Sequence, residues 1–198
     1  MIELWFPTPI WYFKLNLNEC DFSKAISYSI ALSKNCNGIK VSNVGGWHSK
    51  LFSNQDLQKS PLKVFTENIS TCVNICLTDL GASNDVKVYI HNAWININEP
   101  GHYNNKHDHG FTNLSGVFYL TDTNSNINFY KNKDFMDFTT NSVLSNNDTT
   151  CSFKKVTYQP KKGDLLIFPS WLEHDVEYND FLDTRISVAF NLYSYVPN

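Results

Sequence analysis

The sequence has no long apolar run, no basic leader and no strong charge of either sign. None of its hydrophobic stretches reaches the roughly 20 residues that a transmembrane helix needs. Residues 1–13 contain Glu3 and no basic residue, so they do not read as a signal peptide. A formal net charge of −3 gives no general attraction to nucleic acid or anionic membranes. We therefore expect a cytoplasmic protein, in an infected host cell if the gene is viral, with no nucleic-acid or membrane partner.

Cysteine provides neither a zinc motif nor a disulfide framework. The five cysteines are an odd number and show no zinc-type spacing. Cys72 and Cys76 are four residues apart in a helical pattern and share one helix face. We interpret the cysteines as reduced, buried thiols. The chain also lacks internal repeats and linkers, which together with its length predicts a single domain over residues 1–198.

Hydrophobic spacing predicts helices in the first part of the chain. Residues 21–35 carry apolar side chains at helical spacing, with Asp21 as a candidate N-cap. Residues 60–81 form the second candidate, which begins at Ser60 and ends at Gly81. Residues 20–82 are therefore expected to be a helical support, preceded by a strand within residues 1–14.

The apolar period changes to two in the second part of the chain, which predicts a strand-rich core over residues 86–196. The expected strands are 86–98, 114–120, 126–130, 151–159, 164–169, 173–178 and 184–196. Helices followed by many short strands predict a mainly β fold in which flanking helices pack on an all-β sandwich or barrel.

Three histidines are candidate metal ligands. His107 and His109 are two residues apart, so on an extended segment both would point to one side, with Asp108 facing away. His174 follows an apolar strand and a short turn, where a neighbouring strand could bring it to the same place. The pair alone is a weak signal, since a solvated polar loop could also contain it. Imidazoles suit Fe(II), Zn(II) and Cu(II) alike, so these residues do not fix the metal.

Arg185 and Ser187 are candidates for binding an anion. They share one face of an apolar strand, where a buried guanidinium needs an anionic partner such as a dicarboxylate. The alternative is a surface arginine paired with Asp180 or Asp183. Asn96 and Asn98 share a face of another strand and could also bind a carboxylate, although ordinary strand-end asparagines would look the same.

The order of these residues resembles that of the iron(II)- and 2-oxoglutarate-dependent oxygenases. That superfamily has His-x-Asp/Glu, a distant His, and an Arg or Lys about ten residues further on. Here His109 stands where the carboxylate is usual, because the His-x-Asp register would need a histidine at Lys106. A three-histidine site is the direct interpretation, with Asp108 as the second choice. The segment 98–101 also resembles the Tyr-x-Pro-Gly of prolyl 4-hydroxylase-like members, with Asn98 in place of Tyr.

A closer resemblance is to a family of 2-oxoglutarate/Fe(II) oxygenases from bacteria and marine phages. The similar motifs are FPTP (6–9), SNVGGWHS (42–49), the segment 94–120 with SGVFYL at its end, FPSWLEHDV (168–176) and RISVAFN (185–191). They are ordered and spread over nearly the whole chain. One departure is Gly110-Phe111-Thr112, which could alter the mouth of the site but not the ligands.

The resemblance implies a double-stranded β-helix core, of the jelly-roll or cupin-like kind, and a dioxygenase that uses Fe(II), 2-oxoglutarate and O2. His107, His109 and His174 would hold the iron, and Arg185 and Ser187 the far carboxylate of 2-oxoglutarate, with Asn96 and Asn98 beside it. The outcome would be hydroxylation of a C–H bond in a peptide or protein side chain or a small metabolite, with release of succinate and CO2. A homodimer is left open.

The segment 42–49 and Tyr103 are candidates for contacting the substrate. Trp47 and His48 offer a stacking surface and a polar tip, although Trp47 could equally fill the core of a tight turn. His91 and His102 are not expected to bind metal, and His102 is the better candidate for lining the entrance.

Two other functional classes remain open from the sequence. One is a cupin-like enzyme with three histidines that does not use 2-oxoglutarate, in which Arg185 is structural or binds the substrate. The other is a non-catalytic jelly-roll binding or virion protein, which would need neither the histidines nor an inward arginine.

Overall fold

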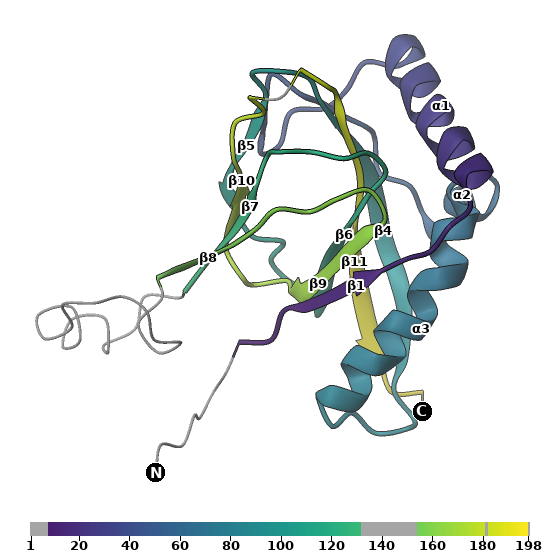
Figure 1. Cartoon of the computed structure of the whole chain (residues 1–198). Coiled ribbons are helices and arrows are strands. Elements are labelled where there is room, and N and C mark those ends of the chain that lie inside the picture. The colour runs from purple at the N-terminus through teal and green to yellow at the C-terminus, as the bar shows by residue number, and fades with distance from the viewer. Residues whose placement is uncertain (1–7, 132–153, 181, 198) are drawn as a thin grey trace, which may run out of the picture.

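Two antiparallel sheets face each other in the computed structural model, which describes residues 8–131, 154–180 and 182–197 (Figure 1). The larger sheet has six strands in the order β1 (Trp11–Lys14), β9 (Asp164–Pro169), β6 (Leu114–Tyr119), β11 (Arg185–Tyr195), β4 (Lys87–Asn98) and β3 (Trp47–His48). The smaller sheet has five, in the order β2 (Asn43–Val44), β5 (Tyr103–His107), β10 (His174–Val176), β7 (Ile127–Tyr130) and β8 (Lys155–Tyr158). Every pairing is antiparallel.

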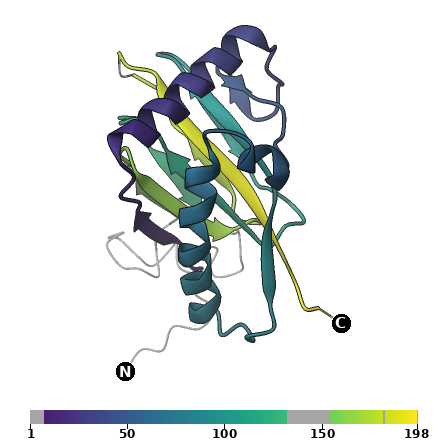
Figure 2. The same ribbon diagram turned by 90° about the vertical axis from the view of Figure 1, so that its right-hand side faces the viewer.

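The helices cover the outer face of the larger sheet. They are α1 (Glu19–Asn35), α2 (Asn54–Gln58) and α3 (Lys63–Asp79), and α1 and α3 lie across its strands (Figure 2). Phe65 of α3 packs on Phe118 of β6 and Phe190 of β11, with ring centroids 5.4 Å apart in both pairs. This packing anchors one face of β6 and β11, so that their opposite face is available to the smaller sheet.

A second, smaller core lies between the two sheets. Val117 and Tyr119 of β6 belong to it, whereas Phe118 between them belongs to the helix-side core. Phe129 of β7 packs against Phe168 of β9 at 4.8 Å. The alternation of side chains along each central strand therefore divides the apolar residues between two cores.

Most expected elements are present with small changes in their ends. The strand expected over 164–169 is confirmed, and the strands expected over 86–98 and 184–196 are present as β4 and β11. The expected cap at Asp21 is wrong: Asn18 caps α1 and accepts a hydrogen bond from the backbone N–H of Asp21. The predicted stop at Gly81 is consistent with its φ of 68°, which favours glycine. Residues 1–7 and 151–153 of the expected strands lie outside the described residues.

The sequence pattern did not reveal four short elements: β2, β3, α2 and β5. Each is five residues or shorter, so periodicity has little to act on. Of the cysteines, Cys72 and Cys76 are buried as expected, but Cys20 and Cys36 are exposed. Cys151 lies outside the described residues. Within the part of the chain that the structure describes, no helix is long and apolar enough to cross a membrane.

Candidate active site

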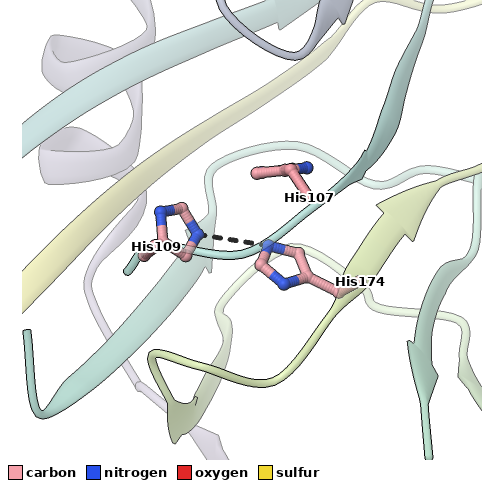
Figure 3. A group of neighbouring side chains, drawn as sticks. All are labelled: His107, His109 and His174. Carbon is pink, nitrogen blue, oxygen red and sulfur yellow. Dashed lines mark hydrogen bonds between the residues drawn. The ribbon is translucent and has the colours of Figure 1, made fainter. Parts of the chain in front are cut away.

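Three histidine side chains converge between the two sheets. His107 is the last residue of β5, His109 lies in the loop that follows, and His174 is the first residue of β10. Because β10 pairs with β5, His174 lies directly opposite His107. One ring nitrogen from each of the three lies within 4.8 Å of the others (Figure 3). The group comes from segments more than 60 residues apart in the sequence.

Backbone carbonyls orient two of the three rings. Nδ1 of His107 lies 2.7 Å from the carbonyl oxygen of Asn105, and Nδ1 of His174 lies 2.9 Å from that of Leu172. A carbonyl only accepts, so each Nδ1 donates its proton and Nε2 carries the lone pair; that of His107 faces the hydroxyl of Ser42 at 3.4 Å.

The facing nitrogens of His109 and His174 have the spacing that a shared cation requires. Nε2 of His109 lies 3.2 Å from Nε2 of His174 (Figure 3). Two imidazole nitrogens that bind one metal at about 2.1 Å, at right angles, are roughly 3 Å apart. The three rings therefore suit a divalent metal bound on one side by protein, with positions left for other ligands.

Burial keeps the three imidazoles neutral. It lowers the pKa of His109 to about 2, with a further contribution from His174, and it lowers the pKa of His174 to about 3. The pKa of His107 is also lowered by burial. A neutral imidazole is the form that binds metal, so no proton has to leave at neutral pH.

Aromatic side chains pack around the histidines. Trp94 of β4 lies 5.3 Å from His109, and Phe168 of β9 lies 4.8 Å from His174, as distances between ring centroids. His48 of β3 stacks on Trp94 at 5.5 Å and is buried. These rings limit how far the histidines can turn and shield them from water.

Asp108 lies outside the group. It is exposed, and its carboxylate accepts a hydrogen bond from the backbone N–H of Gly110 at 2.9 Å. The structure thus directs His107 and His109 into the space between the sheets and leaves the intervening carboxylate at the surface.

Arg185 and Ser187 line the same cavity as the histidines. Arg185 is only 2% exposed, which overturns the alternative of a surface arginine paired with a nearby aspartate. Its Nε and Nη1, like the hydroxyl of Ser187, have no hydrogen-bond partner among the described residues. Burial lowers the pKa of the guanidinium. A buried cation whose donors lack partners is costly, and a bound anion would remove that cost.

Asn96 and Asn98 lie directly across from these two residues. The register of β4 and β11 pairs Asn96 with Ser187, and Asn98 with Arg185. Both amides are buried, and their carbonyl oxygens have no partner among the described residues. The amide nitrogen of Asn98 donates to the side chain of Asn104 at 3.3 Å. Asn96 lines the cavity and can therefore receive a ligand there, whereas Asn98 is not among the residues that line it.

The other predicted substrate residues lie elsewhere. Trp47 packs against the helix-side core and donates to the carbonyl of Cys36, because alternation along β3 sends it to the opposite face from His48. Tyr103 and His102 are not among the residues that line the cavity. His102 packs over Gly45, where an added Cβ would come within 2.3 Å of its ring. For Trp47 the structure favours the alternative in which it fills the core, whereas the expected contact of Tyr103 with substrate stays a prediction.

The sequence analysis missed several aromatic residues that line the cavity, among them Trp94, Tyr119 and Phe168. Trp94 could have been found, since it shares a strand face with Asn96 and Asn98. Tyr119 could not be distinguished from an ordinary core tyrosine. It is buried, and burial raises its pKa to about 12, so it is a neutral neighbour of Ser187.

A family model described as "Putative 2OG-Fe(II) oxygenase" matches residues 92–191, about half of the chain. The match spans the three histidines, Arg185 and Ser187. The chain belongs to the 2-oxoglutarate- and Fe(II)-dependent oxygenases. It is therefore an enzyme of a family that uses Fe(II), 2-oxoglutarate and O2. The narrower resemblance to bacterial and marine phage members stays a prediction.

Solved structures of such oxygenases have the same fold. A prolyl-4-hydroxylase from Pseudomonas putida is 12% identical with a TM-score of 0.60, covering 94% of this chain and 93% of its own. The epimerase SnoN from nogalamycin biosynthesis, solved with Fe3+ and α-ketoglutarate, is 11% identical with a TM-score of 0.67, covering 96% and 82%. HygX from Streptomyces hygroscopicus, solved with nickel and 2-oxoglutarate, is 9% identical with a TM-score of 0.60, covering 94% and 83%.

These similarities confirm the mainly β fold with a double-stranded β-helix core, and at such low sequence identity they show the fold alone. A search of curated proteins found no match for the sequence.

Proposed function

We propose that this oxygenase hydroxylates a C–H bond of a peptide or protein side chain or a small metabolite, and releases succinate and CO2. In this proposal His107, His109 and His174 hold the iron. Arg185 and Ser187 bind the far carboxylate of 2-oxoglutarate, with Asn96 and Asn98 beside it.

The buried guanidinium of Arg185 supports this proposal more than any other observation. Its unpartnered donors and the Ser187 hydroxyl line the same cavity as the histidines. Ala189, further along the same face of β11, lies across from Trp94, which packs on His109. From Arg185 to Ala189 the strand rises roughly 13 Å. The long arginine side chain and a short dicarboxylate can together bridge that distance to the metal.

The protein's contribution is to bind, orient and exclude water. Iron with 2-oxoglutarate and dioxygen supplies the oxidising chemistry when bound. The backbone carbonyls of Asn105 and Leu172 hold two imidazoles with their Nε2 lone pairs toward the cation. Arg185 fixes the cosubstrate by a charge-assisted pair, and Ser187 adds a hydroxyl donor. Trp94 and Phe168 keep the surroundings of the histidines dry.

His48 is proposed as a wall of the substrate side. It is only 4% exposed and stacks on Trp94, and its Nδ1 lies 2.6 Å from the carbonyl of Ser49. That contact fixes the ring and leaves Nε2 as its other polar atom. Hence His48→Phe is expected to keep iron and 2-oxoglutarate binding while it alters substrate turnover.

The decisive experiment combines spectroscopy and product analysis. The anaerobic iron protein is titrated with 2-oxoglutarate while its metal-to-ligand charge-transfer absorption is followed, and succinate is then measured after oxygen is admitted. We expect the absorption to saturate and succinate to form. If neither occurs with iron bound, the cupin-like alternative without 2-oxoglutarate replaces this proposal. If no metal binds at all, the alternative of a non-catalytic jelly-roll protein replaces this proposal.

The ligand set has its own test. His107→Ala, His109→Ala and His174→Ala should each lose iron, quantified after anaerobic reconstitution, whereas Asp108→Ala should retain it. Retention in His109→Ala with loss in Asp108→Ala would make the carboxylate the second ligand.

A further inference from the structure

An exposed aromatic surface continues the inner face of the larger sheet beyond the histidines. Three tyrosines form it: Tyr89 of β4 and Tyr193 and Tyr195 of β11, which are 43%, 42% and 49% exposed. Tyr89 lies 5.9 Å from each of the other two, and His91 lies 6.3 Å from Tyr193, as distances between ring centroids. We call Tyr89, His91, Tyr193 and Tyr195 the tyrosine platform.

The platform lies on the same face of β11 as the cosubstrate pocket. Alternation puts Arg185, Ser187, Ala189, Asn191, Tyr193 and Tyr195 on one side of the strand. Next to Asn191, one residue of β4 is left without a partner in β11. The extra residue belongs to β4, so side chains along β11 continue to alternate between its two faces. Residues 185–192 are buried, and exposure begins at Tyr193.

The ends of β4 and β11 extend beyond the smaller sheet. In Figure 1 they run on toward the C-terminus, past the level of β5, β7 and β10. From Ala189 at the pocket wall to Tyr195 the strand rises roughly 20 Å. A molecule whose reacting group entered the pocket from this end would lie across the platform.

The loops beside the metal site also carry exposed aromatic side chains at this end. Phe111, in the loop after His109, is fully exposed, and Trp171, three residues before His174, is 46% exposed. The first loop is attached to β11, because the side chain of Asn113 accepts a hydrogen bond from the backbone N–H of Ser194 at 2.9 Å. Large exposed apolar groups that gather on one surface mark an interaction site.

Two features indicate a polypeptide as the occupant. The first is an open strand edge. Among the described residues, the backbone of β4 at residues 87–91 pairs with β11 on one side and with no strand on the other, because β3 reaches only Asn96 and Ile97. A free edge of this kind can add an extended peptide through main-chain hydrogen bonds.

The second feature is the chemistry of the platform. None of its four side chains is a lysine, an arginine or a carboxylate, but the exposed Lys87 of β4 pairs with Tyr195 and lies beside them. A single lysine does not compensate the phosphates of a nucleic acid. Its rings meet at 46° and 66° and form a ridged surface, whereas bases stack on flat faces. Tyrosine is enriched where proteins bind other polypeptides, since it offers a rigid apolar ring and a polar tip.

We infer that the tyrosine platform and the open edge of β4 bind an extended segment of a polypeptide substrate whose side chain reaches the iron. This inference rests on the proposed function and narrows it from peptide or metabolite to polypeptide. In this inference the exposed ends of β4 and β11 bind those substrate residues that flank the residue to be hydroxylated.

The test uses the iron- and 2-oxoglutarate-loaded protein without oxygen. A pool of random peptides about ten residues long, roughly 33 Å when extended, is passed over the immobilised protein. The best retained peptide is resynthesised, and its dissociation constant is measured by fluorescence anisotropy. A cello-oligosaccharide and an oligothymidylate are measured in the same way.

We expect the peptide to bind and the other two polymers not to. The double variant Tyr193→Ala/Tyr195→Ala should weaken peptide binding at least about tenfold, since it removes two stacking rings. The matched control is Tyr178→Ala, because Tyr178 is 61% exposed and packs near Gly101 at the other end of β4. The control should bind the peptide like the parent.

Several outcomes would overturn the inference. They are retention of parental affinity in the double variant, an equal loss in Tyr178→Ala, preferential binding of the oligosaccharide or the oligonucleotide, and no binding of any probe. In each of these cases normal 2-oxoglutarate binding, followed by its charge-transfer absorption, leaves the proposed function intact. Failure of the parent to bind 2-oxoglutarate would refute the proposed function instead.

Discussion

Replacing Arg185 with methionine should weaken cosubstrate binding and, in the same protein, leave the stability of the empty fold unchanged or raise it. The two effects have one cause. Without cosubstrate the guanidinium is 2% exposed, and two of its nitrogens lack partners. With 2-oxoglutarate bound, the same group would meet a carboxylate. Methionine retains much of the apolar stem and removes the charge.

The structure allows the size of each effect to be worked out. Removing one partner of a buried charge pair costs about 3–5 kcal/mol, which at about 1.4 kcal/mol per tenfold is roughly 100- to 4,000-fold in dissociation constant. Replacing buried charges with apolar groups of similar volume is neutral or stabilising by about 1–4 kcal/mol. For a chain of this length each kcal/mol shifts Tm by about 2–4 °C.

The assay has two measurements on each protein. Tm is measured without cosubstrate and with saturating 2-oxoglutarate, and the dissociation constant comes from the anaerobic titration of the iron protein. The parent should be stabilised by 2-oxoglutarate and Arg185→Met should not. Lys106→Met is a suitable control, because it removes a positive charge beside His107 from a half-exposed pair with Glu173, and such pairs contribute about 0–1 kcal/mol.

One result would refute the reasoning. If Arg185→Met bound 2-oxoglutarate as tightly as the parent while keeping its iron, Arg185 would not be the carboxylate anchor. If the variant without cosubstrate were instead several degrees less stable than the parent, the guanidinium would have partners that stabilise the fold.

Three further predictions follow from the same cavity and strands. Ser187→Ala should weaken 2-oxoglutarate binding less than Arg185→Met does, since one hydrogen bond to a charged group contributes about 1.5–3 kcal/mol; the same titration measures it. Gly116→Ala should lower the free energy of unfolding by about 1–3 kcal/mol in urea denaturation, because its Cβ would lie 2.3 Å from the ring of Phe190. The metal-free protein should lose stability as pH falls below about 6.5, because the unfolded chain then binds protons that buried His109 and His174, with pKa values of about 2 and about 3, do not. Each of these two histidines adds a slope of about 1.4 kcal/mol per pH unit down to about pH 3; urea titrations at pH 7, 6 and 5 would measure it, and a flat profile would contradict it.

The sequence by itself determined the class of fold and the order along the chain of the candidate metal-binding and anion-binding residues. Apolar runs bounded by turn residues indicated the strands directly, and the continuous run of β9 was placed correctly at both ends. The spacing of His107 and His109, and of Arg185 and Ser187, placed each pair on one side of an extended segment because side chains alternate along a strand. These features are local, so they can be read from neighbouring residues.

Only the tertiary structure decided which side chains meet. Pairing of β5 with β10 places His174 opposite His107, and pairing of β4 with β11 places Asn98 opposite Arg185. The sequence left open whether Trp47 contacts substrate or fills the core, because the direction of a side chain in a two-residue strand depends on the partner strand rather than on the strand's own pattern. Burial of Arg185 without a partner is likewise a property of packed sheets. A local sequence pattern states which residues share a face, and the packing of the sheets determines what that face contacts.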